Sequence, residues 1–125
     1  MSRITSDRLV YDANGIVAQY KSPIPGVESF LVVPKRGGHI EILDLAAESS
    51  GTGIGRAAVT EFLSWAAANG FRQVRADSTR VAVGFWERQG FHDTGRKDGK
   101  LHIFSRHIAP TTDLDPSAPR RKPRP

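Results

Sequence analysis

Apolar and polar residues alternate along the first half of the chain, as they do in β-strands that bury one face. The pattern predicts four strands, over residues 9–11, 16–20, 29–33 and 39–45. Asn14 and Gly15 separate the first two strands, which favours a β-hairpin. In the fourth strand, regular alternation places His39 and Glu41 on one face and Asp44 on the other.

The second half of the chain begins with a helical period. Ile54, Ala58, Phe62 and Ala66 recur every four residues, which predicts a helix over residues 53–69. A strand is expected over residues 71–76, a helix over 80–89, and a closing hairpin formed by 92–95 and 101–105 around a turn at 96–99. The order β-β-β-β-α-β-α-β-β indicates an α/β protein with a mixed sheet.

A boundary is predicted at residue 110. Residues 110–125 contain five of the eight prolines, and Leu114 is their one large apolar residue. Such a segment buries too little apolar surface to offset the entropy of ordering it. We therefore expect one domain over residues 1–109 and a disordered tail, rich in proline and arginine, over residues 110–125.

Composition excludes several classes of protein. The chain has 125 residues, no cysteine and a net charge of +5. It can form neither a disulfide nor a thiolate metal site, and its histidines lack ligand spacing, so no metal is expected. No apolar run approaches the roughly 18 residues of a membrane helix, so we expect a cytoplasmic protein without a membrane partner. The positive charge favours an anionic partner, such as nucleic acid or a phosphorylated cofactor.

The residues between the fourth strand and the first helix, Gly51-Thr52-Gly53-Ile54-Gly55-Arg56, suit phosphate binding. Glycines let backbone N–H groups approach an anion, and a helix N-terminus adds unpaired donors. A P-loop would need lysine after its last glycine, and a dinucleotide fingerprint would need glycine at position 56, so both are excluded. An acyl-CoA pyrophosphate loop and a turn that binds nothing remain as alternatives.

Two segments resemble motifs of the GCN5-related N-acetyltransferases, the GNAT superfamily. Leu43–Ala58 is similar to the family's strand, glycine loop and helix, and Ala82–Phe91 is similar to its Ala-x-x-Phe-Tyr-Glu-x-x-Gly-Phe motif. One helix and one strand separate the segments, as in the family. The resemblance implies a GNAT-like acyl-CoA N-acyltransferase fold. It also implies acetyl transfer from acetyl-CoA to a primary amine, by direct attack in a ternary complex.

The resemblance further implies where acetyl-CoA binds. The pyrophosphate would contact the glycine loop, and the pantetheine arm would follow the fourth strand where it separates from its neighbour. A backbone N–H near Leu45 would polarise the thioester carbonyl. The residues so implicated are Leu43, Leu45, Gly51, Thr52, Gly53, Ile54, Gly55, Arg56 and Trp86.

Catalytic groups are less clearly indicated. The acceptor amine must lose a proton before it attacks, so a base is needed, and His39, Glu41 and Asp77 are the candidates. Trp86 replaces the tyrosine that often protonates the leaving thiolate in the family, and Ser50 replaces a Gln or Arg. Indole has no useful acidity, so water, another donor or the coenzyme must supply that proton, or catalysis is weak.

The family's one or two helices between its first strands have no counterpart here. Residues 21–28 are too few and too rich in proline to form them. We therefore expect an open acceptor site, suited to an amine on a protein or a modified nucleic acid, or covered by the second subunit of a homodimer. Two alternative functions remain: a weak or inactive CoA-binding or regulatory module, and a nucleic-acid-associated protein that acts through its basic tail.

Overall fold

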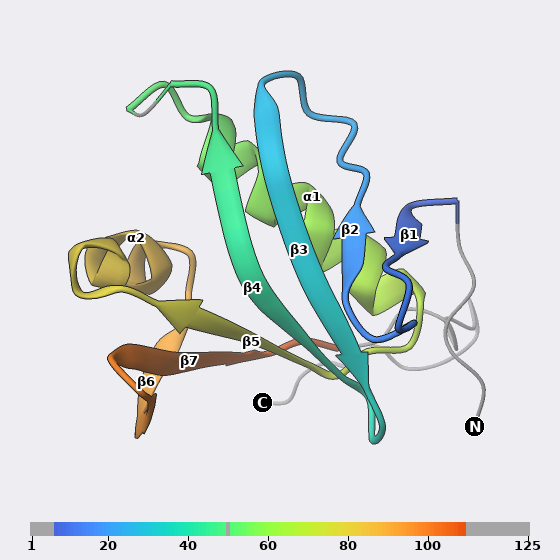
Figure 1. Ribbon diagram of the computed structural model, residues 1–125. Helices are drawn as coiled ribbons and strands as arrows, with labels where there is room; N and C mark the ends of the chain where they lie inside the picture. Colours follow the sequence, from blue (N-terminus) through green and yellow to red (C-terminus); the bar gives the residue numbers. More distant parts are fainter. Residues whose placement is uncertain (1–6, 50, 110–125) are drawn as a thin grey trace, which may run out of the picture.

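The computed structural model describes residues 7–49 and 51–109, so the predictions for Ser50 and for the tail over residues 110–125 lie outside it. Seven strands form one sheet in the order β1-β2-β3-β4-β5-β7-β6 (Figure 1). Neighbouring strands are antiparallel except β4 and β5, which are parallel. The strands are β1 (Leu9–Tyr11), β2 (Ala18–Tyr20), β3 (Val27–Lys35), β4 (His39–Ala47), β5 (Gln73–Ser78), β6 (His92–Asp98) and β7 (Leu101–His107).

Two helices connect the later strands. α1 (Ile54–Ala68) joins β4 to β5, and α2 (Val83–Arg88), preceded by a 3-10 turn (Arg80–Ala82), joins β5 to β6. Each connection links strands that run in the same direction, and such crossovers are right-handed, which places both helices on one face of the sheet. Figure 1 shows α1 behind β2, β3 and β4. Neither helix in the described ranges is long and apolar enough to cross a membrane.

The core lies between the sheet and α1. Ala58, Phe62 and Ala66 are fully buried, as the predicted spacing of four requires, whereas Ile54 at the start of α1 is half-buried. Alternate strand residues complete the core, among them Val32, Ile40, Ile42, Val74, Ala76 and Phe104. The strand residues between these positions point the other way, to a surface that we call the open face. We define the open face by Val33, Glu41, Arg75, Asp77 and Ile103.

β4 contains one residue that the register with β3 skips. The pairing passes from Ile42 to Asp44, so Leu43 between them forms a β-bulge. Asp44 pairs with Leu31, whose two strand neighbours are both buried, so Asp44 lies on the open face with Glu41. Ser29 Oγ donates a hydrogen bond to Asp44 Oδ2 (2.6 Å). The prediction that Asp44 lies opposite Glu41 is therefore wrong, because it assumed unbroken alternation.

The predicted order of elements is confirmed, with differences at their ends. β5 begins two residues later than expected because the Phe71 N–H still donates to the Ala66 carbonyl (3.0 Å), which completes the C-terminal turn of α1. β6 continues to Asp98, so the hairpin turns after residue 98 rather than over 96–99. The first turn of the expected second helix is a 3-10 turn.

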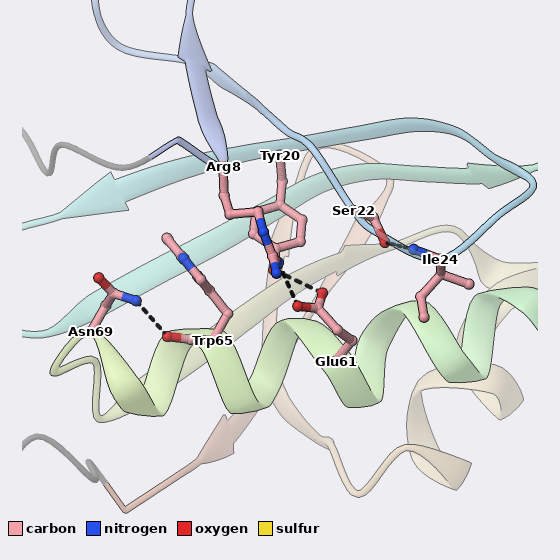
Figure 2. Close-up of polar contacts among 7 residues, drawn as sticks. All are labelled: Arg8, Tyr20, Ser22, Ile24, Glu61, Trp65 and Asn69. Carbon is pink, nitrogen blue, oxygen red and sulfur yellow. Dashed lines mark hydrogen bonds and ion pairs between the residues drawn. The ribbon is translucent and has the colours of Figure 1, made fainter.

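A polar cluster of Arg8, Tyr20 and Glu61, which we call the Glu61 cluster, fixes the β1–β2 hairpin to α1 (Figure 2). The Tyr20 hydroxyl donates to Glu61 Oε1 (2.8 Å), and Arg8 Nη1 donates to the Tyr20 oxygen (2.6 Å) and to Glu61 Oε2. Tyr20 is 1% exposed. Burial, and then the hydrogen bond and charge of Glu61, raise the pKa of its hydroxyl. No helix lies between β2 and β3 in the structure, as predicted.

Candidate functional site

A cavity of about 460 Å³ lies where β4 and β5 separate. The parallel pairing ends at Ile42 and Ala76, beyond which the two strands have no further register. The end of β4, the glycine loop, the first turn of α1 and one side of α2 form its walls. The lining residues are Leu45, Ala47, Ser49, Gly51, Gly53, Ile54, Gly55, Arg56, Ala82, Phe85, Trp86, Arg88 and Gln89.

The glycine loop has a backbone that side chains would strain. Gly51 and Gly53 have φ of 75° and 87°, in the left-handed region that favours glycine. A Cβ at either position would meet nothing within 4 Å, so conformation rather than crowding requires glycine there. Among the described residues, no side chain caps the start of α1 and no acidic residue lies in its first turn. The N–H groups of that turn therefore suit an anionic ligand, and exposed Arg56 adds positive charge.

Gly55 is required for a different reason. A Cβ there would lie 3.3 Å from Phe85 Cε1, so the first turn of α1 packs directly against α2. The Phe85 and Trp86 rings meet edge to face at 5.0 Å, and Trp86 meets Phe91 at 5.1 Å. Trp86 is 5% exposed. Its indole is therefore part of a packed aromatic wall that borders the cavity.

Two carboxyl groups meet on the open face where the strands separate. Glu41 Oε1 lies 3.2 Å from Lys35 Nζ. Burial acts to raise the pKa of Glu41, but hydrogen bonds with Asp77 and Lys35 and the charges of Lys35 and Arg75 outweigh it, so the pKa falls below its ordinary value. Burial, the hydrogen bond with Glu41 and the charges of Glu41 and Asp98 raise the pKa of Asp77 to about 7. Below about pH 7 the pair therefore holds one proton, on Asp77, while Glu41 stays ionised.

The structure brings most of the predicted site residues together. Seven of the nine predicted coenzyme contacts line the cavity: Leu45, Gly51, Gly53, Ile54, Gly55, Arg56 and Trp86. Leu43 and Thr52 do not: Leu43 forms the bulge, and Thr52 Oγ1 donates to the Ser49 carbonyl (3.3 Å). Glu41 and Asp77 lie together, whereas His39 lies at the other end of the β4–β5 pairing, opposite Gln73.

Other cavity residues were missed by the sequence analysis. Phe85 and Arg88 on α2, and Gln89 at its C-cap, line the cavity. Their spacing of i, i+3 and i+4 marks one helix face and is the signal that could have identified them. Arg88 is a second cation in the cavity lining, in addition to Arg56. Within the described residues, no group of three or more histidine or carboxylate side chains is placed to hold a metal ion.

Comparison with known proteins gives a match for most of the chain. The family model described as the acetyltransferase (GNAT) domain matches residues 7–104. This range includes the glycine loop, both helices and the Glu41–Asp77 pair. A search of the curated proteins found no match.

Solved acetyltransferases share the fold at low sequence identity. An acetyltransferase from Thermus thermophilus superposes with a TM-score of 0.61 at 19% identity, over 77% of this chain and 67% of that one. Tetrahymena GCN5 gives 0.59 at 12% identity, over 75% and 68%. The PaiA N-acetyltransferase from Thermoplasma acidophilum, solved in complex with coenzyme A, gives 0.59 at 20% identity. That match covers 66% of this chain and 54% of PaiA. The predicted fold is confirmed by these likenesses.

Proposed function

Because the chain belongs to the GNAT family of acetyltransferases, we propose that it transfers acetyl from acetyl-CoA to a primary amine by direct attack in a ternary complex. The observation that carries the proposal is the cavity between the glycine loop and α2, at the point where β4 and β5 separate. Its volume of about 460 Å³ lies in the range of small-ligand sites. PaiA, which shares the fold, was solved with coenzyme A and supports an acyl-CoA ligand here.

Acetyl-CoA would be held mainly by backbone groups. The N–H groups of residues 51–56 are proposed to bind the pyrophosphate, with Arg56 and Arg88 supplying positive charge at the cavity. Beyond Ile42, β4 has no register partner on its β5 side, so its backbone is available to pair with the pantetheine amides. The N–H of Leu45, on the cavity wall, is proposed to polarise the thioester carbonyl.

Glu41 is proposed as the base that removes a proton from the attacking amine. Its carboxylate stays ionised at neutral pH, because hydrogen bonds and cations hold its pKa low despite burial. His39 is the weaker candidate. It lies two residues before Glu41 on β4. It is therefore about 7 Å farther than Glu41 from the point where β4 and β5 separate, which we call the fork.

The acceptor is proposed to approach from the open face, which no helix of the described residues covers. An uncovered site admits an amine on a protein or a modified nucleic acid, and a second subunit could cover the same surface in a homodimer. A cytoplasmic location remains part of the proposal, since the chain has no cysteine to oxidise.

Binding of CoA to the glycine loop is the direct test. Calorimetry should show one site, and Gly53→Ala should weaken it severalfold by straining the loop. Gly70→Ala is the matched control, because Gly70 also has positive φ (86°) and open space but lies at the far end of α1. Equal effects of both variants, or no CoA binding by the wild type, would contradict the proposal.

Turnover separates the enzyme from a CoA-binding module. Release of free thiol from acetyl-CoA in the presence of a panel of primary amines is expected for the enzyme. The specific observation that favours the module is buried Trp86 in the place of an acidic hydroxyl. CoA binding without thiol release from any amine would support that second function.

A further inference from the structure

The position of Asp77 is specific within the sheet. It is the first residue of β5 beyond the parallel pairing with β4, which ends at Ala76. Ala76 and Ser78 on either side are buried in the core, so Asp77 projects to the open face. Its partner on β7 is Ile103, which cannot titrate. Asp77 therefore lies at the fork itself, beside Glu41.

The carboxyl group of Asp77 is not satisfied by the rest of the protein. Its Oδ1 atom is buried without a hydrogen-bond partner among the described residues. The Lys35 ammonium forms its ion pair with Glu41. The charged groups around Asp77 are Glu41 on β4, Asp98 on β6 and Lys35 on β3, with Arg75 preceding it on β5. The negative charges of Glu41 and Asp98 disfavour ionisation of Asp77, so the Asp77 carboxyl group retains its proton beside the ionised Glu41.

Among the described residues, the cavity walls lack a group that could protonate a thiolate. Their polar side chains are Ser49, Arg56, Arg88, Gln89 and the Trp86 indole. Arginine keeps its proton at all relevant pH values, and hydroxyl, amide and indole groups are far weaker acids than a thiol. The leaving group of an acyl-CoA reaction therefore needs a donor from elsewhere at the fork.

We propose that Asp77 is the proton donor to the departing CoA thiolate, working as a pair with Glu41. This inference rests on the acetyl-transfer function proposed above. The neutral amine forms its N–C bond as the C–S bond breaks. The nitrogen gives a proton to the Glu41 carboxylate, and the sulfur takes the proton of Asp77. The proton on Glu41 then moves to Asp77, so the pair returns to one proton and the products are the amide and CoA thiol.

The first experiment follows kcat/KM from pH 6 to 9, with rates expressed on the concentration of unprotonated amine. The wild type should lose activity above about pH 7, as Asp77 ionises. Asp77→Asn should lower kcat about a hundredfold and abolish this alkaline limb, with the Kd for CoA unchanged within about twofold. Asp93→Asn is the matched control. Asp93 is an exposed strand carboxylate that accepts a hydrogen bond from the Gly95 N–H, and an asparagine at this position can accept the same bond. This variant should retain the wild-type profile.

The second experiment is a carbon-13 NMR titration of the aspartate carboxyl groups, which needs no turnover. The Asp77 signal should titrate near pH 7 in the wild type and at least one unit lower in Glu41→Gln. An Asp77 signal that titrates near 4 overturns the proposal, as does an Asp77→Asn enzyme that keeps the alkaline limb. A wild type that binds CoA but acetylates no amine overturns the proposed function and this role together, so the two failures are distinguishable.

Discussion

Two clusters of buried or half-buried polar groups lie on opposite sides of the sheet, and they differ in how completely they are satisfied. In the Glu61 cluster, both carboxylate oxygens accept a hydrogen bond, and Tyr20 both donates and accepts one. In the Glu41–Asp77 pair, one oxygen of Asp77 is buried without a partner among the described residues, and the Lys35 ion pair is made to Glu41. Each cluster joins elements that are distant in the sequence.

The contrast separates a structural role from a chemical one. A fully satisfied network holds elements in place, because removing one member leaves the others unpaired. An incompletely satisfied pair lowers stability and is retained where its proton is used, as is common at functional sites. The Glu61 cluster should therefore affect folding, and the Glu41–Asp77 pair should affect turnover.

The largest effect is expected for Glu41→Gln. Loss of the proposed base should lower kcat about a hundredfold or more, measured as initial rates of thiol release. The free energy of unfolding should change by less than about 1 kcal/mol, because the Lys35 side chain is half exposed and such ion pairs contribute little. If Glu41→Gln instead lowered the free energy of unfolding by several kcal/mol, the Glu41–Asp77 pair would have a structural role, as the Glu61 cluster does.

Glu61→Ala is expected to act in the opposite way. The variant removes the acceptor of the buried Tyr20 hydroxyl and one acceptor of the Arg8 guanidinium, which should cost about 2 kcal/mol of unfolding free energy in urea titrations. Exposed Glu87, on α2, is the matched control, and Glu87→Ala should stay within about 0.5 kcal/mol of the wild type. A loss below about 0.5 kcal/mol for Glu61→Ala would show that the cluster does not hold the hairpin.

Asp77→Asn should make the protein more stable at neutral and alkaline pH. The pKa of Asp77 is about 7 in the folded protein and 3.8 in the unfolded chain, so the wild type loses stability as pH rises between these values. Asparagine does not ionise. We expect a gain of about 1 kcal/mol at pH 8, allowing for partial solvent exposure, and no gain near pH 3. Urea titrations at both pH values measure it, and a loss of stability at pH 8 contradicts the sign.

The smallest effect is expected for Arg8→Lys. Arg8 Nη1 donates to both Tyr20 and Glu61, and lysine keeps the charge but loses the planar guanidinium, which lies 5.7 Å from the centre of the Tyr20 ring. The expected loss is about 0.5 to 1 kcal/mol in the same urea assay. Arg36→Lys, in the exposed turn between β3 and β4, should change nothing measurable.

Much of the fold was predictable because its signals are local. Alternation identified the strands, spacing of four identified α1, and glycines at 51, 53 and 55 identified the loop that borders the cavity. The bulge at Leu43 was not predictable, since no residue near it marks a break in register. The position of Asp44 was wrong for that reason.

The polar clusters were only partly predictable because they depend on long-range register. Glu41 and Asp77 were both candidates, but their contact depends on how β4 and β5 align after a crossover through α1. Tyr20 and Glu61 are 41 residues apart, and nothing local links them. The cavity face of α2 was missed because its i, i+3 and i+4 spacing marks a face of the helix without indicating what that face borders.

Because of the bulge in β4, residues an even number of positions apart on this strand face two different surfaces, the open face and the cavity. Glu41 points to the open face, whereas Leu45 and Ala47 line the cavity on the helix side, although a regular strand would send all three the same way. In the proposed reaction, amine and thioester would approach β4 from opposite sides and meet at the bulge. A strand that kept Leu43 in regular alternation, without the bulge, would instead put the proposed base and the cavity wall on one side.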